Sequence, residues 1–153
     1  MSWLSNKSLA SKVRNNASHD TLVSFEGIFS IDKLPQFISH RPFLAIVNTH
    51  THNLPGEHWL AIYIDGDKRG ELFDPLSLPI SNILIQWMNR FTIKWKTNNH
   101  AFQDILSSSC GAFVLYFVLN RCHVDSFESI TSSFSSYPSV NEEFVKNFYD
   151  SLL

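Results

Sequence analysis

Residues 58–75 read HWLAIYIDGDKRGELFDP. The first eight of these residues are rich in aromatic and β-branched side chains and predict a buried strand. The polar middle predicts a hairpin connection, and the last residues predict a return strand that Asp74-Pro75 ends. An antiparallel ladder brings the end of the second strand back to the start of the first. We therefore expect Asp74 to lie beside His58.

Strand and helix patterns alternate outside this hairpin. We expect helices at residues 2–16, 80–90, 111–120 and 141–153, strands at 21–25, 43–48 and 92–96, and a short turn at 30–35. The segment 111–120 is almost entirely apolar, which predicts a buried helix. This mixed order indicates an α+β fold with a central mixed sheet, formed by residues 1–153 as a single domain.

Composition favours a globular chain and excludes some functions. Of the 153 residues, 44% are hydrophobic and 17% are charged, and the 13 Phe residues indicate an aromatic core. The formal net charge of -2 gives no support for a nonspecific nucleic-acid binder. No apolar run resembles a secretory signal, and none approaches the ~20 residues that a membrane span needs.

The N-terminal stretch has two interpretations. It is rich in Ser, mildly basic and free of acidic residues before Asp20, as a mitochondrial presequence would be. Leu4, Leu9 and Val13 are also spaced as on one face of an amphipathic helix. We favour a helix that docks on the domain.

The two cysteines, Cys110 and Cys122, need separate explanations. On one straight helix they would lie about 18 Å apart, which excludes a disulfide. Cys110 directly precedes Gly111 and the apolar helix, where the helix dipole and free N–H groups favour the thiolate. Gly111 lets a substrate backbone approach closely. Cys110 is therefore a candidate nucleophile, although a buried structural cysteine is the commoner case.

A thiol nucleophile needs a base, and the base needs an orienting group. His58 begins a strand, so its ring is expected at the edge of the sheet, and the hairpin supplies Asp74 as the orienting carboxylate. Gln103 lies seven positions before Cys110. Its amide could donate, with the Cys110 N–H, to a developing oxyanion. Read singly, Asp74 is equally a turn residue and Gln103 a polar loop residue.

Two other chemistries are weaker. A metal site would gather His50, His52 and His58, but the chain supplies no matched second ligand set, and a polar connection explains the first two. The hydroxyls of residues 107–109 are far poorer nucleophiles than a thiol when unaided. We therefore expect no metal and no cofactor.

The candidate residues also match a family pattern. Together, Glu57-His58-Trp59, Phe73-Asp74-Pro75, Gln103 and Ser109-Cys110-Gly111 resemble the adenovirus endopeptidases, the adenain family, and are more distantly similar to the ubiquitin-like-protein proteases. The likeness runs from about residue 20 to about residue 120. It implies a papain-like or adenain-like cysteine protease domain whose buried helix carries the nucleophile at its N-terminus.

The resemblance assigns roles to six residues. The catalytic residues would be His58, Asp74, Gln103 and Cys110, and the substrate-binding residues Trp59 and Gly111. The implied function is a cysteine endopeptidase that processes viral, or virus-like, structural precursor proteins at Gly-containing sites. The alternative is an isopeptidase that removes ubiquitin or a ubiquitin-like modifier. We expect a monomer that acts in the virion and the host-cell interior, in the nucleus or the cytoplasm, and is neither secreted nor bound to a membrane.

The chain departs from adenain in its activators. Adenain-like proteases use a disulfide-linked peptide and DNA, but no Cys precedes Gln103 here, and Cys122 lies beyond the catalytic helix. The chain is also mildly acidic, where adenain is basic. We therefore expect a noncovalent activating peptide or none, and no activation by DNA.

Overall fold

The computed structural model describes residues 5–17, 23–49, 58–123 and 125–153. Within these ranges the strands are β1 (Ser24–Ser30), β2 (Phe43–Asn48), β3 (Trp59–Ile64), β4 (Arg69–Phe73) and β5 (Lys94–Thr97). The helices are α1 (Asn6–Asn16), α2 (Asn82–Phe91), α3 (Cys110–Cys122), α4 (Phe127–Ser132) and α5 (Pro138–Asp150), with a 3-10 turn, η1, at Ile31–Lys33. No helix in the described part of the chain is long and apolar enough to cross a membrane.

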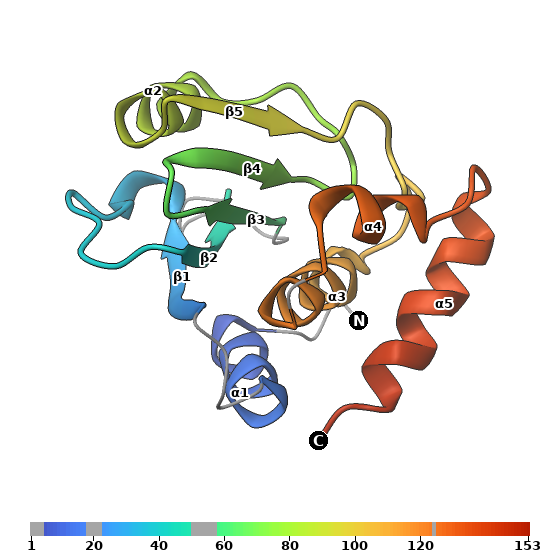
Figure 1. Cartoon of the computed structure of the whole chain (residues 1–153). Coiled ribbons are helices and arrows are strands. Elements are labelled where there is room, and N and C mark those ends of the chain that lie inside the picture. The colour runs from blue at the N-terminus through green and yellow to red at the C-terminus, as the bar shows by residue number, and fades with distance from the viewer. Residues whose placement is uncertain (1–4, 18–22, 50–57, 124) are drawn as a thin grey trace.

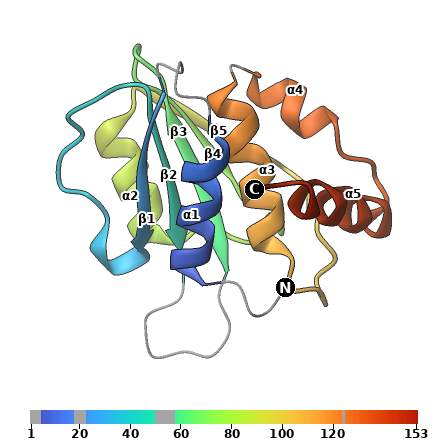
Figure 2. The same cartoon turned by 90° about the horizontal axis from the view of Figure 1, so that it is seen from below.

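The strands form one sheet in the order β1-β2-β3-β4-β5. The two outer pairs are parallel and the two inner pairs antiparallel, so the sheet is mixed. Helix α2 covers one face, and α1 and α3 cover the other (Figure 2). Because both faces are covered, every residue of β2 and β3 is buried. The predicted α+β fold with a central mixed sheet is confirmed.

Helix α3 lies between the sheet and α5 (Figures 1 and 2). Ten of its 13 residues are buried, as its nearly continuous apolar sequence predicts. Its first residue is Cys110 and its last is Cys122, and within the described residues neither cysteine forms a disulfide. The two cysteines thus lie at opposite ends of α3. The prediction that they form no disulfide with each other is confirmed.

Phenylalanine rings fill the space between the sheet and α3. The Phe73 ring stacks on Phe117 with centroids 4.8 Å apart, and Phe102 lies 6.2 Å from Phe73 and 4.7 Å from Phe134. Burying such rings supplies much of the apolar stabilisation of a small domain. Phe73 and Phe102 directly precede Asp74 and Gln103, so this cluster also anchors two candidate site residues.

Candidate active site

The β3–β4 hairpin determines where His58 and Asp74 lie. In the ladder Ala61 pairs with Phe73, so one further step sets Asp74 opposite Leu60. His58 lies two residues before Leu60 and therefore on the same side of the strand. Its Nε2 is 2.8 Å from Asp74 Oδ1, and the two residues are 9% and 5% exposed. The predicted proximity of the two side chains is confirmed.

Backbone and side-chain groups hold the Asp74 carboxylate in place. Its two oxygens accept the backbone N–H groups of Leu76 at 2.9 Å and Leu78 at 3.0 Å. Asn98, at the end of β5, accepts the Asp74 N–H at 2.9 Å and donates to the Asp74 carbonyl at 2.6 Å. Asn98 is 6% exposed. Sequence reasoning missed this residue, although a polar amide two positions after the strand predicted at 92–96 was the available signal.

A small cavity of about 110 Å³ lies against the pair. Besides His58 and Asp74, its walls are mostly apolar: Ile31, Leu60, Leu72, Leu78, Pro79, Ile80 and Leu84, with Thr49 and Ser81. Apolar surroundings lower the local dielectric and strengthen hydrogen bonds and charge interactions. The apolar walls therefore strengthen the hydrogen bond between the His58 imidazole and the Asp74 carboxylate.

The protonation of His58 follows from its neighbours. Burial alone would lower its pKa, but hydrogen bonds to Asp74 and Cys110, with the charges of these groups, outweigh burial and raise the pKa to about 9. Asp74 occupies Nε2, so Nδ1 is the ring nitrogen that remains for the thiol. A protonated imidazole beside a cysteine favours the thiolate. The site thus holds the side-chain types that a base, its orienting acid and a nucleophile require.

The two cysteines have different surroundings. Cys110 is the first residue of α3 and is 3% exposed. Cys122, at the other end of the helix, is 2% exposed, and burial raises its pKa to about 11. A buried thiol with a raised pKa is chemically inert. The chemistry of this helix is therefore expected at its N-terminal end.

Gln103 is fixed close to the same site. The N–H groups of Phe102 and Gln103 both donate to the Pro75 carbonyl, at 2.9 and 3.0 Å, so this segment lies beside the residue after Asp74. The Gln103 Nε2 donates to the Ser107 carbonyl at 3.1 Å and contacts the Ser107 hydroxyl at 3.3 Å. Its Oε1 is buried and has no hydrogen-bond partner among the described residues. An oxyanion role for Gln103 stays a prediction.

A carboxylate from α5 organises the loop that leads to Cys110. Glu142 Oε1 accepts the Asp104 N–H at 3.0 Å and the Ser107 hydroxyl at 2.7 Å. Its Oε2 accepts the hydroxyl of Ser109. Sequence reasoning missed Glu142, because it lies 32 residues after Cys110 on a helix with an ordinary amphipathic pattern.

The two residues predicted to bind substrate, Trp59 and Gly111, are both buried. Trp59 is 2% exposed and donates its indole N–H to Asn6 Oδ1 of α1 at 2.8 Å. The indole packs in the core here, and Gly111 is buried in the first turn of α3. Contacts of both residues with substrate stay predictions. His50 and His52 lie outside the described residues, which contain no cluster of His, Cys, Asp and Glu side chains suited to a metal ion.

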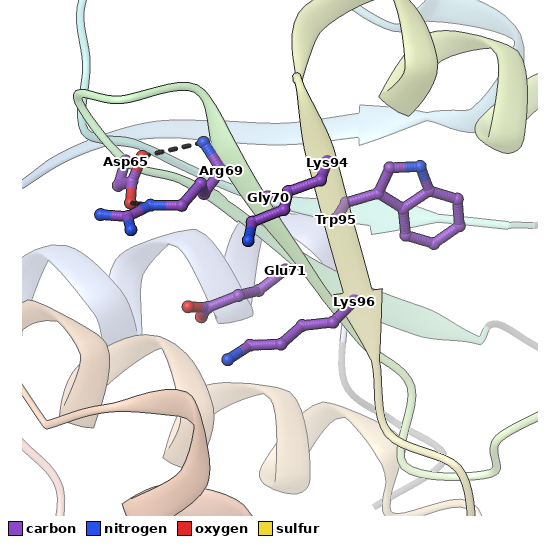
Figure 3. Close-up of a pocket in the computed structure, with 7 residues that line it drawn as sticks. All are labelled: Asp65, Arg69, Gly70, Glu71, Lys94, Trp95 and Lys96. Atoms are coloured by element: carbon purple, nitrogen blue, oxygen red, sulfur yellow. Dashed lines mark hydrogen bonds and ion pairs between the residues drawn. The ribbon is translucent and has the colours of Figure 1, made fainter.

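A second cavity, of about 410 Å³, lies at β4 and β5 (Figure 3). Several of its charged side chains are held in ion pairs. Arg69 pairs with Asp65, and Arg121 of α3 pairs with Glu71 at 2.7 Å. Lys94 and Lys96 extend from β5 on the same side as Glu71, whereas Trp95 points away (Figure 3). Among the described residues that line this cavity there is no cysteine or histidine.

The α+β fold is similar to the folds of two solved structures. The structure is similar to the ASFV pS273R protease, with a TM-score of 0.51 and 24% identity, covering 65% of this chain and 39% of that one. It is also similar to the central domain of the Lpg1148 protein from Legionella pneumophila, with a TM-score of 0.53 and 10% identity, covering 97% and 98% of the two chains. The chain thus spans about two fifths of the ASFV protease. Neither protein-family models nor curated protein sequences match this chain.

Proposed function

We propose that this protein is a cysteine endopeptidase whose nucleophile is Cys110. One observation carries the proposal: His58 is buried and bonded to Asp74 at 2.8 Å, and Cys110, which begins α3, is among the groups that raise the pKa of its imidazole. A nucleophile, a base and an orienting carboxylate in contact are the parts that thiol-dependent acyl transfer needs. The protease fold is compatible with this chemistry.

The proposed reaction has two stages. The Cys110 thiolate attacks the scissile carbonyl carbon, and the negative charge that forms on the carbonyl oxygen is stabilised by the Cys110 N–H and the Gln103 amide. His58 then gives its proton to the leaving amine as the C–N bond breaks, leaving a thioester on Cys110. In the second stage His58 takes a proton from water, the hydroxide adds to the thioester, and the thiolate leaves.

Asp74 serves the base rather than the substrate. Its hydrogen bond orients the imidazole, and its charge stabilises the imidazolium, which is present when the thiolate attacks and forms again in the second stage. Because two backbone N–H groups and Asn98 fix Asp74, the ring that it holds is fixed too. Such fixed geometry lets the charges act without reorganisation during the reaction.

The substrate class rests on the resemblance to adenain. We propose viral or virus-like precursor proteins cut at Gly-containing sites, with Trp59 and Gly111 beside the substrate. The enzyme would act in the virion and the host-cell interior as a monomer. A noncovalent peptide is the activator that suits a chain with no cysteine before Gln103.

Cleavage of a peptide library tests the activity. The purified chain is incubated with peptides that carry Gly at varied positions, and the new termini are mapped by mass spectrometry. We expect cuts next to Gly with wild type and none with Cys110→Ala. Equal cleavage by the two proteins would contradict the assignment. Rapid labelling of Cys110 by ubiquitin-like vinyl sulfones, without library cleavage, would favour the isopeptidase role.

A further inference from the structure

Ser109 is the N-cap residue of α3, but it does not cap the helix. The hydroxyl of an N-cap serine usually accepts the backbone N–H of the second or third helical residue, with the serine backbone extended. Those residues are Gly111 and Ala112. Here Ser109 has φ -92° and ψ 10° and makes no side-chain cap bond. Its hydroxyl donates to Glu142 and lies 2.7 Å from the Ser107 hydroxyl, so its oxygen is held by these two residues.

Because the Ser109 hydroxyl does not cap α3, the backbone N–H of Gly111 is left without a capping acceptor. The Ser109 carbonyl accepts the N–H groups of Ala112 at 2.9 Å and Phe113 at 3.3 Å. The Gly111 N–H has no acceptor among the described residues. It sits one residue after the proposed nucleophile, at the positive end of the helix dipole. This N–H is the donor that a capping Ser109 would consume.

We propose that Glu142 is a positioning residue that keeps Ser109 from capping α3, so that the Gly111 N–H serves as a further donor to the oxyanion. The proposal rests on the cysteine endopeptidase function and deepens it. Glu142 does not touch the substrate. It acts through Ser109, which is 7% exposed. If the carboxylate is removed, little water can reach the Ser109 hydroxyl to replace it as a hydrogen-bond partner.

The contacts of Glu142 suit this role. One oxygen anchors the loop at Asp104 and Ser107, and the other holds the Ser109 hydroxyl. The Ser107 oxygen in turn accepts the Ser109 N–H at 3.3 Å, which supports the unusual backbone of Ser109. Without Glu142, the extended cap geometry becomes the favourable one for Ser109, because an N-cap bond satisfies the orphan Gly111 N–H.

Two reactions at Cys110 separate this role from a general structural one. Acylation by p-nitrophenyl acetate passes through an oxyanion and releases coloured p-nitrophenol. Alkylation by iodoacetamide needs the thiolate but forms no oxyanion. We compare both rates for wild type, Glu142→Ala, Glu142→Gln and the matched control Glu143→Ala, whose side chain is exposed.

We expect Glu142→Ala to slow acylation at least about tenfold, because loss of an oxyanion donor costs about 10²–10³ in rate. Alkylation should change less than about twofold, since the thiolate is untouched. Glu142→Gln should recover most of the acylation rate, because an amide of the same length still engages Ser109. Glu143→Ala should behave as wild type.

A double variant tests the capping step itself. Adding Ser109→Ala to Glu142→Ala removes the hydroxyl that would take the Gly111 N–H, so acylation should recover by about fivefold or more relative to Glu142→Ala. Failure to recover, or a wild-type acylation rate in Glu142→Ala, would overturn the proposal while the endopeptidase function stands. A wild type that alkylates but never acylates at Cys110 would overturn both.

If Glu142→Ala does not fold, Ser109→Asn tests the same proposal. Asn is a strong N-cap residue, and its carboxamide oxygen is expected to accept the Gly111 N–H. Acylation should then fall while alkylation persists. Unchanged acylation in folded Ser109→Asn would contradict the proposal.

Discussion

The Nε2 atom of His58 lies 2.8 Å from Oδ1 of Asp74, and both side chains are almost wholly withdrawn from water. The relationship follows from the register of one hairpin, in which the strand that ends at Asp74 returns beside the strand that His58 begins. It directs the other ring nitrogen to Cys110 and keeps the imidazole protonated at neutral pH. The predictions below follow from this geometry.

Asp74→Asn should reduce kcat by about 10²–10⁴, because the imidazole loses its orienting charge. It should also move the alkaline limb of the rate profile to lower pH, since the Asp74 charge and hydrogen bond raise the pKa of His58. The measurement is kcat/KM against pH on a peptide found in the library. Asp65→Asn, at the far turn of the same hairpin, is the matched control and should leave both unchanged. An Asp74 variant with the wild-type alkaline limb would contradict the prediction.

The stability of the fold should depend on pH through His58. Its pKa is about 9 in the folded chain against an ordinary 6.5, so the folded state holds the proton more tightly than the unfolded chain does. The proton on His58 therefore adds to the free energy of unfolding. This addition is complete below pH about 6.5 and is lost as the pH rises through about 9. We expect the free energy of unfolding, measured with urea at both ends of this range, to fall more in wild type than in His58→Gln. Equal losses in the two proteins would argue against the raised pKa.

The two thiols should differ in reactivity. With a pKa of about 11, Cys122 presents only about one thiolate in ten thousand at pH 7. Cys110 lies beside a protonated imidazole and should alkylate with iodoacetamide much faster, as peptide mapping of a time course would show. His58→Gln should abolish the difference. Equal rates in wild type would mean that the site is not assembled in the isolated chain.

Asn98→Ala should destabilise the fold by about 1–3 kcal/mol, because it leaves the buried N–H and carbonyl of Asp74 without their partners. Activity should fall with it, since Asp74 loses its anchor. Asn99→Ala, at the exposed neighbouring position, is the control and should change stability little. Urea unfolding of the three proteins measures the difference, and equal midpoints for Asn98→Ala and wild type would rule out the anchoring role.

Local patterns predicted most of the architecture. The strand at 43–48 has the observed bounds, and the hairpin, the buried helix and the closing helix were each found within a few residues of their positions. Helix α4 was missed because its six residues are mostly polar and too short for a helical period. The strand expected at 21–25 runs from Ser24 to Ser30, and residues 21 and 22 lie outside the described part of the chain.

Within the site, local contacts could be predicted from the sequence and long-range contacts could not. His58 and Asp74 were paired correctly because hairpin geometry is local and its register follows from short-range pairing. Asn98 and Glu142 were not found, because their contacts join segments 24 to 38 residues apart and depend on how helices pack on the sheet. The burial of Trp59 depends in the same way on α1, which supplies Asn6 as the partner of its indole.

The most direct test of the central claim is to locate the covalent intermediate. Wild type and His58→Gln are treated with p-nitrophenyl acetate, quenched in acid, digested and mapped by mass spectrometry. We expect an acetyl group on Cys110 in wild type, its near absence in His58→Gln, and none on Cys122. An acetyl group spread equally over both cysteines, or placed on a serine of residues 107–109, would contradict Cys110 as the nucleophile.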